Sequence, residues 1–400
     1  MTAARARDPS AAPPRTLFVT HSGVMGGAER SLLDLVDRWK GERQVMLLAA
    51  GPLAAAFESR GIPVLVDPLG ALGAIRRESG LPGLGALADV ARLASRMAKV
   101  AKRMDVIHAN SQKAFVVAAA AGLLARKPVV WHLRDILTTA HFSSSNIRAA
   151  VMLANARAAA VIANSVATAQ AFREAGGRAD LVHVVHNGIA AARFDAVADA
   201  EIAAQREALG AGDAFVLAVC ARLAPWKGQH VVLAAMDVLP DAHAWIIGAA
   251  LFGEDAYAES LRSQAESLGV ATRVRFLGER EDVPALFKAA DAVVHSAVDA
   301  EPFGRVVVEG MLARRPVIAS DAGGVREIVR HGETGWLVPP GDPAALAAAV
   351  REVRALSNAA RQAICERAYA DAHERFSIPA MVDGVSSVLA TVLSARQRRT

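Results

Sequence analysis

The sequence predicts an α/β protein made of two doubly wound domains, each with a mainly parallel sheet. The chain has 400 residues, more than a single hydrophobic core comfortably supports. In both halves, short apolar runs alternate with longer segments of helical periodicity, which is the pattern of βα units. Between the halves, residues 190–212 are rich in alanine and charge and contain no strand pattern. We therefore place a domain boundary near residue 190.

The first domain is expected to span residues 15–190. Its strands are expected in apolar runs of four to six residues. The predicted strands are Thr16–His21, Gln44–Ala49, Pro63–Val66, Val106–Ala109, Val129–His132, Ala160–Ala163 and Val182–Val185. Helical periodicity between them is clearest in Arg30–Trp39 and Leu84–Met104.

The second domain is expected to span residues 191–379 and to repeat the pattern. Its predicted strands are Phe215–Val219, Ala244–Gly248, Arg273–Leu277, Ala292–Ser296 and Val317–Ala319. A helix is expected over Val306–Leu312.

Composition and the chain ends indicate a reduced, cytoplasmic protein. Residues 1–14 carry arginines and prolines but no apolar segment, so we interpret them as a disordered leader and not as a secretory signal. No run of 18 apolar residues free of charge occurs, so no membrane span is expected. Cys220 and Cys365 are the only cysteines and do not have metal-ligand spacing.

Charge is unevenly distributed along the chain. Residues 1–190 contain 23 Lys and Arg against 13 Asp and Glu, whereas the remainder contains 22 against 27. A basic first half fits an acidic acceptor, or peripheral contact with the anionic inner face of a membrane. The basic face of Leu84–Met104 fits that interpretation, and it fits a surface helix that covers a sheet equally well. Segregated solubility charge is the plain alternative, and no nucleic acid is expected as a partner.

The segment from Glu301 to Glu309 is the most informative stretch of the chain. Pro302 and Gly304 predict a sharp turn between a buried strand and a helix. Glu301 is then expected just outside the helix N-terminus, and Glu309 about two turns inside it. Backbone N–H groups of residues 303–305 would point out of this turn toward phosphate or sugar oxygens. Two acids around such a turn suggest chemistry on a polyhydroxylated ligand that carries phosphate.

Arg222 and Lys227 are the predicted phosphate contacts. They follow the strand that begins at Phe215, and ligands bind at the carboxyl ends of strands in open α/β sheets. Arginine presents a planar fork to phosphate oxygens and lysine a point charge. A solvated pair of loop cations is the alternative interpretation.

Two further candidate positions lie in the first half. Gly26 and Gly27 follow the first strand and open a helix, where glycine allows close approach of the backbone to a ligand. Glu29 is interpreted as an acid of the first helical turn. His132 ends a strand and is expected to face the ligand site, whereas a structural role is favoured for His108.

These segments together resemble the retaining glycosyltransferases of family 4. The resemblance extends from about residue 16 to about residue 350, in the order that the family shows. The segments that carry it are Gly26–Glu29, His186–Ile189, Ala221–Gly228, Glu301–Glu309, Gly323–Glu327 and Gly332–Val338. Ala221 stands where the family usually has glycine.

The resemblance implies a GT-B fold with the active site in an interdomain cleft. The first domain would hold the acceptor, the second would bind the nucleotide sugar, and the last helix, about 380–400, would pack back on the first. Arg222 and Lys227 would bind the diphosphate, Glu309 the ribose, and Glu301 with Phe303, Gly304 and Arg305 the donor sugar. His132 would lie near the transferred sugar.

The implied activity is retaining transfer from a UDP- or GDP-linked sugar to a hydroxyl of a glycan or a lipid-linked acceptor. Because the chain has no Asp-x-Asp and places basic side chains at the diphosphate, no metal and no cofactor are expected. The rival hypotheses are an epimerase or a phosphorylase on the same fold, and a non-catalytic protein that binds nucleotide sugars.

Overall fold

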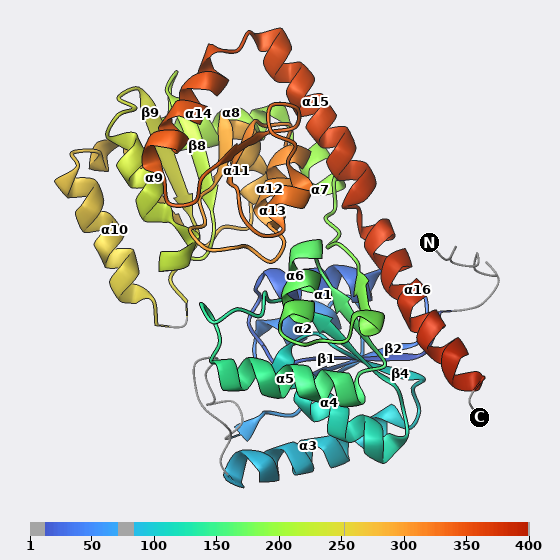
Figure 1. Ribbon diagram of the computed structural model, residues 1–400. Helices are drawn as coiled ribbons and strands as arrows, with labels where there is room; N and C mark the ends of the chain where they lie inside the picture. The colour runs from blue at the N-terminus through green and yellow to red at the C-terminus, as the bar shows by residue number, and fades with distance from the viewer. Residues whose placement is uncertain (1–12, 71–83, 252, 399–400) are drawn as a thin grey trace. The chain divides into compact units, whose positions relative to one another are not determined.

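The computed structural model describes residues 13–70, 84–251 and 253–398. It divides into two compact units (Figure 1). Unit 1 contains the described residues up to Gly188 together with those from Ile378 onward, and unit 2 contains Ile189–Ser377. Most of the predicted leader lies outside the described residues. The Pro14 carbonyl accepts hydrogen bonds from Thr16 Oγ1 at 2.9 Å and Trp39 Nε1 at 3.2 Å, so ordered structure begins before residue 15.

Unit 1 is built on a parallel sheet with the strand order β3-β2-β1-β4-β5-β6-β7. Its strands are β1 (Thr16–Thr20), β2 (Arg43–Leu47), β3 (Val64–Val66), β4 (Val106–Ala109), β5 (Val129–Leu133), β6 (Ala160–Ala163) and β7 (Val182–Val184). Its helices are α1 (Gly27–Asp37), α2 (Pro52–Glu58), α3 (Leu84–Ala101), α4 (Gln112–Ala125), α5 (Ser144–Arg157), α6 (Val166–Glu174) and α16 (Ile378–Gln397), with the 3₁₀ turn η2 (Ala179–Leu181).

Helices cover both faces of this sheet, as a doubly wound fold requires. Alternate strand residues such as Val19, Ile107 and Trp131 pack with α3, α4 and α5 in one buried cluster. Figure 1 shows those helices below the sheet of unit 1 and α1, α2 and α6 on its opposite side.

Unit 2 contains a second parallel sheet, with the order β10-β9-β8-β11-β12-β13. Its strands are β8 (Phe215–Cys220), β9 (Ala242–Ile247), β10 (Val274–Gly278), β11 (Ala292–His295), β12 (Val317–Ser320) and β13 (Trp336–Val338). Its helices are α7 (Ala192–Asp195), α8 (Asp199–Ala208), α9 (Gln229–Met236), α10 (Asp255–Ser267), α11 (Val283–Ala289), α12 (Arg305–Leu312), α13 (Val325–Ile328), α14 (Pro343–Ala355) and α15 (Asn358–Arg375), with the 3₁₀ turns η3 (Pro225–Lys227) and η4 (Ala271–Arg273).

The predicted fold class is confirmed, and most predicted strands lie within two residues of those observed. The sequence did not predict β13, which has only three residues and follows a glycine-rich loop. Helix α12 begins at Arg305, one residue before the predicted start, and Glu309 lies about one turn inside it and not two.

The chain crosses between the units twice, after Gly188 and after Ser377. On the unit 2 side the two crossing segments are bonded to each other, with Ile189 N donating to the Phe376 carbonyl at 2.8 Å. Beyond the second crossing, α16 packs against α1 and β6 of unit 1. Among the described residues, one helix, α16, has the length and apolar composition needed to cross a membrane. This is weak support for a span, because a core helix can have the same length and composition.

Candidate functional site

The chain order of the strands in unit 2 reverses between β8 and β11, which are neighbours in the sheet. β9 and β10 continue to one side, and β12 and β13 to the other. Open parallel sheets bind ligands at such a switch point, outside the carboxyl ends of the strands. Residues 221–228 follow β8 and residues 296–304 follow β11. Both charged segments that the sequence singled out therefore lie at the switch point.

Backbone contacts hold these two loops together. Val298 N donates to the Trp226 carbonyl at 2.9 Å, and Ser296 Oγ donates to the Lys227 carbonyl at 3.0 Å. Gly228 lies at the point of closest approach, with φ of 68° in the left-handed region. A Cβ atom there would come within 1.9 Å of the Ser296 carbonyl oxygen. Only glycine fits this position without moving the Lys227 loop.

Gly228→Ala should therefore lower the free energy of unfolding of unit 2 by roughly 2 kcal/mol or more, since backbone strain and a backbone clash add. Gly210 is a matched control, because its φ is 62° and a Cβ atom added there would meet no other atom within 4 Å. Gly210→Ala should cost only about 1 kcal/mol. Urea unfolding of both variants checks this, and equal losses would contradict the assigned role of the close approach.

Lys227, Glu301 and His295 form one charged cluster at the switch point. Lys227 Nζ is ion-paired and hydrogen-bonded to Glu301 Oε2, and His295 Nε2 lies 3.4 Å from the same oxygen. The Lys227 ammonium also lies 3.9 Å from the centroid of the Trp226 ring. The side chains of Lys227 and Glu301 are only 17% and 14% exposed, so water screens their attraction weakly.

This cluster keeps Glu301 ionised. Burial raises the pKa of the Glu301 carboxyl, but the Lys227 charge and the His295 hydrogen bond outweigh it and bring the pKa to about 2. At neutral pH Glu301 is therefore an acceptor of hydrogen bonds, as required of a carboxylate that binds sugar hydroxyls. A low pKa and an ion pair also make it a poor nucleophile.

The turn after Glu301 is held from behind by two glycines. Gly324 N donates to the Glu301 carbonyl at 2.8 Å, and Gly323 forms a parallel bridge with Glu301. A Cβ on Gly323 would lie 2.3 Å from the Glu301 carbonyl oxygen. The Gly-Gly pair noted in the sequence thus positions the Glu301 backbone.

The first turn of α12 completes this part of the site. Gly304 caps the helix at φ of 100° and has no side chain to accept from the N–H groups of the first turn. Arg305 Nη2 lies 3.5 Å from Glu309 Oε1 and forms an i,i+4 ion pair with it. Phe303 is buried, and its ring packs edge-on against Phe376.

Arg222 lies two residues after the end of β8 and is half-buried. The fully buried Gln229 donates from Nε2 to the Arg222 carbonyl at 3.0 Å, which ties the start of this loop to α9. Arg222 and Lys227 therefore lie at the two ends of one loop. In the part of the chain that the structure describes, no group of three His, Cys, Asp or Glu side chains is placed to hold a metal ion.

Unit 1 has its own switch point, between β1 and β4. Gly26 and Gly27 lie there, with Gly26 at the cap position of α1. Glu29 is an acid of the first turn, as expected, and is 8% exposed. Burial raises the pKa of its carboxyl, opposed by hydrogen bonds from nearby backbone N–H groups and by the Arg134 charge.

His132 is buried, contrary to the expectation that it faces a ligand. Its side chain is 0% exposed, and its Nδ1 lies 3.0 Å from Nε2 of the equally buried His108. Burial, together with the Arg134 charge, lowers the pKa of His108 to about 3 and that of His132 well below its usual value. The pair is therefore neutral at physiological pH, and one imidazole donates to the other. Strand alternation explains the correction, because His132 points to the same sheet face as His108 and Phe18.

Arg134, two residues further on, is a functional candidate that the sequence reasoning missed. Its Nε donates to Asn110 Oδ1 at 2.9 Å, and its Nη1 donates to Asn187 Oδ1 and to Ser31 Oγ. Asn110 Nδ2 donates in turn to the Ala28 carbonyl at 3.3 Å. A 7% exposed guanidinium thus joins the ends of β4 and β5 to α1 and to the first crossing between the units.

His295 was missed as well. The signal was available, because it occupies the last position of the strand that leads to Glu301. The rule that placed Arg222 beyond β8 would have placed His295 at the end of β11.

The two doubly wound sheets match the GT-B fold of solved glycosyltransferase structures. The chain is 39% identical to Anabaena HepE in complex with UDP and glucose, with a TM-score of 0.86, over 94% of this chain and 99% of that one. A glycosyltransferase from Rickettsia africae, 18% identical, shares the fold over 94% of the chain with a TM-score of 0.82.

Two family models match in succession: "Glycosyl transferase 4-like domain" over residues 26–188 and "Glycosyl transferases group 1" over residues 201–371. The two matches together cover most of both units, and the chain is a glycosyltransferase.

Curated relatives match a shorter part of the chain. The lipopolysaccharide core biosynthesis glycosyltransferase LpsE of Rhizobium meliloti is 32% identical over 179 residues, 45% of this chain and 51% of that protein. The phosphatidyl-myo-inositol mannosyltransferase of Mycobacterium leprae is 36% identical over 177 residues, 43% of this chain and 45% of that protein. These matches span about half the length of the curated relatives, so the acceptors named for those proteins are not assigned to this one.

Proposed function

We propose that this enzyme is a retaining glycosyltransferase that uses a UDP-linked hexose as donor and a hydroxyl of a glycan or lipid-linked glycan as acceptor. The observation that carries the proposal is the Lys227–Glu301–His295 cluster at the switch point of unit 2, beside the first turn of α12. UDP is favoured over GDP because the 39% identical HepE was solved in complex with UDP-glucose.

The cluster suits a diphosphate that gains negative charge as the glycosidic bond breaks. Preorganised cations in a poorly hydrated site stabilise such charge in the transition state. An ammonium has three donors, so Lys227 can keep its bond to Glu301 and still donate to a phosphate oxygen. Arg222 would bind the same diphosphate, and the α12 N-terminus would add the positive end of its dipole. On this basis we propose transfer without a metal ion.

The acids and the glycines receive the remaining roles in the proposal. Glu309 would bind the ribose hydroxyls. Glu301, with the backbone of residues 303–305, would bind the donor sugar. Gly26 and Gly27, at the α1 N-terminus, would let a phosphate oxygen come close to the backbone N–H groups there. For His132 we propose a supporting role beneath Arg134, since it is buried and bonded to His108.

Retention is proposed to proceed by attack on the same face of the sugar. A double displacement needs a free carboxylate beneath the anomeric carbon. Glu301 is engaged with Lys227 and His295, and its pKa of about 2 makes it a weak nucleophile. The leaving phosphate would instead help to remove the acceptor proton.

The acceptor is proposed to bind on unit 1. A pocket of about 360 Å³ lies at the carboxyl edge of its sheet and is lined by His21 and Lys113 among others. Lys113 is the one charged side chain of this otherwise largely apolar lining, and its ammonium suits an acceptor that carries a phosphate or carboxylate group. Peripheral contact with an anionic membrane surface and a cytoplasmic location belong to this proposal, although two of the basic residues of α3, Arg92 and Arg96, are ion-paired to Asp67.

Nucleotide binding measured by thermal shift in EDTA tests the donor site. UDP at 100 times its Kd should stabilise the protein by about 2.7 kcal/mol, with smaller shifts for GDP and ADP. With Glu309→Gln, about tenfold more UDP should be needed for the same stabilisation, since the substitution removes a charge-assisted hydrogen-bond acceptor. Glu259→Gln, at an exposed position on α10, is the matched control and should behave as wild type.

A UDP effect that appears only with Mg²⁺ would contradict the metal-free proposal. Equal effects of UDP on both variants would contradict the role of Glu309. The anomeric configuration of the product, read by NMR, tests retention. Turnover of UDP-sugar without any acceptor would favour an epimerase instead.

A further inference from the structure

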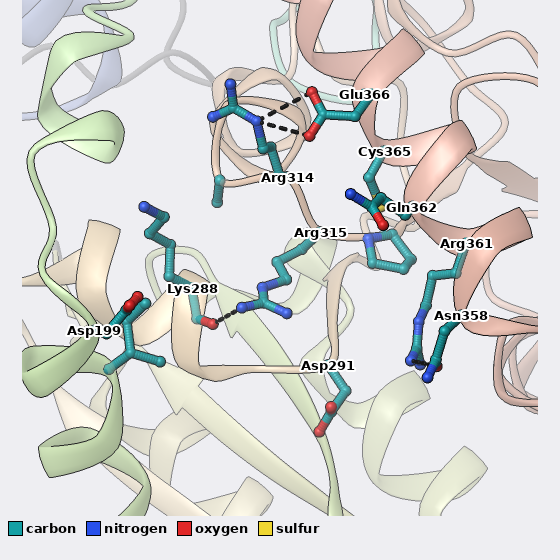
Figure 2. A pocket seen from close by; sticks show the side chains of 13 residues that line it. Asp199, Lys288, Asp291, Arg314, Arg315, Asn358, Arg361, Gln362, Cys365 and Glu366 are labelled. Carbon is teal, nitrogen blue, oxygen red and sulfur yellow. Dashed lines mark hydrogen bonds and ion pairs between the residues drawn. The ribbon is translucent and has the colours of Figure 1, made fainter.

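A second charged pocket lies in unit 2 at the opposite edge of its sheet from the donor loops. It has a volume of about 410 Å³ and includes Asp291 and Pro316, which directly precede β11 and β12. Lys288 of α11 and Arg361 of α15 line it with Arg315, which lies between α12 and β12 (Figure 2). The donor loops follow the carboxyl ends of β8 and β11, so the two sites are separated by the length of the strands.

Two of the three acids in this pocket, Asp291 and Glu366, are paired with arginines other than Arg315 and Arg361. Arg314 Nε donates to Glu366 at 3.1 Å, and Asp291 lies 3.2 Å from Arg206 and accepts from Val216 N at 2.8 Å. Asp199 is exposed at the start of α8. Within the described parts of the chain, none of Lys288, Arg315 and Arg361 is ion-paired to a carboxylate. Three cations that form no ion pair therefore line the pocket, together with the Asp291 carboxylate, whose charge acts on Arg315.

Arg315 is the most informative of the three. Its Nη2 donates to the Lys288 carbonyl, whereas its buried Nε has no hydrogen-bond partner in the structure. A buried guanidinium donor without an acceptor is costly unless a ligand or water supplies one. Figure 2 shows Arg315 between Lys288 on one side and Asn358 and Arg361 on the other. Arg361 itself donates from Nη2 to Asn358 Oδ1 at 2.7 Å.

We propose that this pocket binds the phosphate group of a small phosphorylated metabolite. Arg315 offers a buried donor that lacks an acceptor, and Lys288 and Arg361 add positive charge to the same lining. Arginine binds phosphate groups bidentately. The volume exceeds that of a bare ion and falls in the range of small-molecule sites, which leaves room for a polar body of about hexose size. The site is separate from the donor loops and does not depend on the proposed donor.

Inorganic phosphate is the first probe, titrated by calorimetry and thermal shift at ionic strength kept constant with KCl. Saturable binding to the full-length protein is expected. Arg361→Gln should weaken it about tenfold, since one charge-assisted pair is lost. Arg367→Gln is the matched control, because it removes the same charge from an exposed position on the same helix and should bind as wild type.

Lys227→Gln separates this site from the donor site. Phosphate binding that survives Lys227→Gln and fails in Arg361→Gln supports the proposal. The proposal would be overturned if phosphate binding were lost only in Lys227→Gln, or if Arg361→Gln bound phosphate as tightly as wild type. It would also be overturned if KCl alone gave the same stabilisation as phosphate. Because Arg315 is largely buried and its replacement could unfold the unit, Lys288→Gln serves as the second variant and should also weaken binding. Hexose 6-phosphate is the second probe, and tighter binding than phosphate would support a metabolite as the natural ligand.

Discussion

Replacing Lys227 with methionine is expected to lower the rate of sugar transfer by about 10²- to 10³-fold. Removing one preorganised donor from a site where negative charge develops costs on this order. The side chain is 17% exposed, so water cannot readily replace the lost charge. The loss should appear in kcat, because the interaction strengthens only as the diphosphate departs. Steady-state kinetics with the UDP-sugar and a suitable acceptor give the measurement.

Two further variants show whether charge, and not folding, explains that loss. Lys227→Arg keeps the charge and should recover part of the activity. Lys227→Met also leaves the Glu301 carboxylate buried beside His295 alone, so stability should fall together with activity. Adding Glu301→Gln removes that buried charge and should restore stability without restoring transfer. Recovery of both in the double variant would assign Lys227 a structural role only.

The second large effect is expected in the stability of unit 1 toward acid. The pKa of His108 is about 3 in the folded protein and 6.5 when unperturbed, and that of His132 is lowered in the same direction. Below pH 6.5 the unfolded chain therefore binds more protons than the folded chain, so stability falls as pH falls toward the folded pKa. At pH 4.5 His108 alone should cost about 2 to 3 kcal/mol relative to pH 7.

Hydrogen exchange in β4 and β5, followed between pH 6.5 and 5, measures this loss above the range in which most carboxylates titrate. Replacing both His108 and His132 with phenylalanine should flatten the pH dependence of hydrogen exchange, and His141→Gln should leave that dependence unchanged. If the double variant does not fold, NMR titration of the wild-type imidazoles shows directly whether His108 and His132 stay neutral at acid pH. Protonation of His108 near pH 6.5 would contradict its burial as a neutral pair.

Much of unit 2's site could be predicted from the sequence because its parts are local. Pro302 and Gly304 dictate the turn, the apolar run dictates the strand, and a strand end in a parallel sheet positions the residues that follow. That rule places Arg222, Lys227 and Glu301 in the loops after strands, whereas Glu309 lies in the following helix and its role was implied by the family resemblance. The choice of Arg305 between Glu309 and phosphate was not predictable, because both partners lie within reach of the same long side chain.

Unit 1 was predicted less well, for a physical reason. His132 occupies the expected strand end, but strand periodicity turns it toward His108, and the face of a strand end cannot be read from its position alone. Arg134 escaped notice because its partners Asn110, Ser31 and Asn187 are remote in the chain. Contacts between residues so far apart in the chain depend on the order of the strands in the sheet.

The sequence by itself therefore determined the α/β class, most of the strands and the two charged loops, since these follow from hydrophobic periodicity and from turn residues. The tertiary structure alone decided which groups meet. It paired Glu301 with Lys227 and His295, buried His132 against His108, and brought Lys288, Arg315 and Arg361 to one pocket. Burial and pairing set the charge state of each group, and both are properties of packing between segments that are distant in the chain.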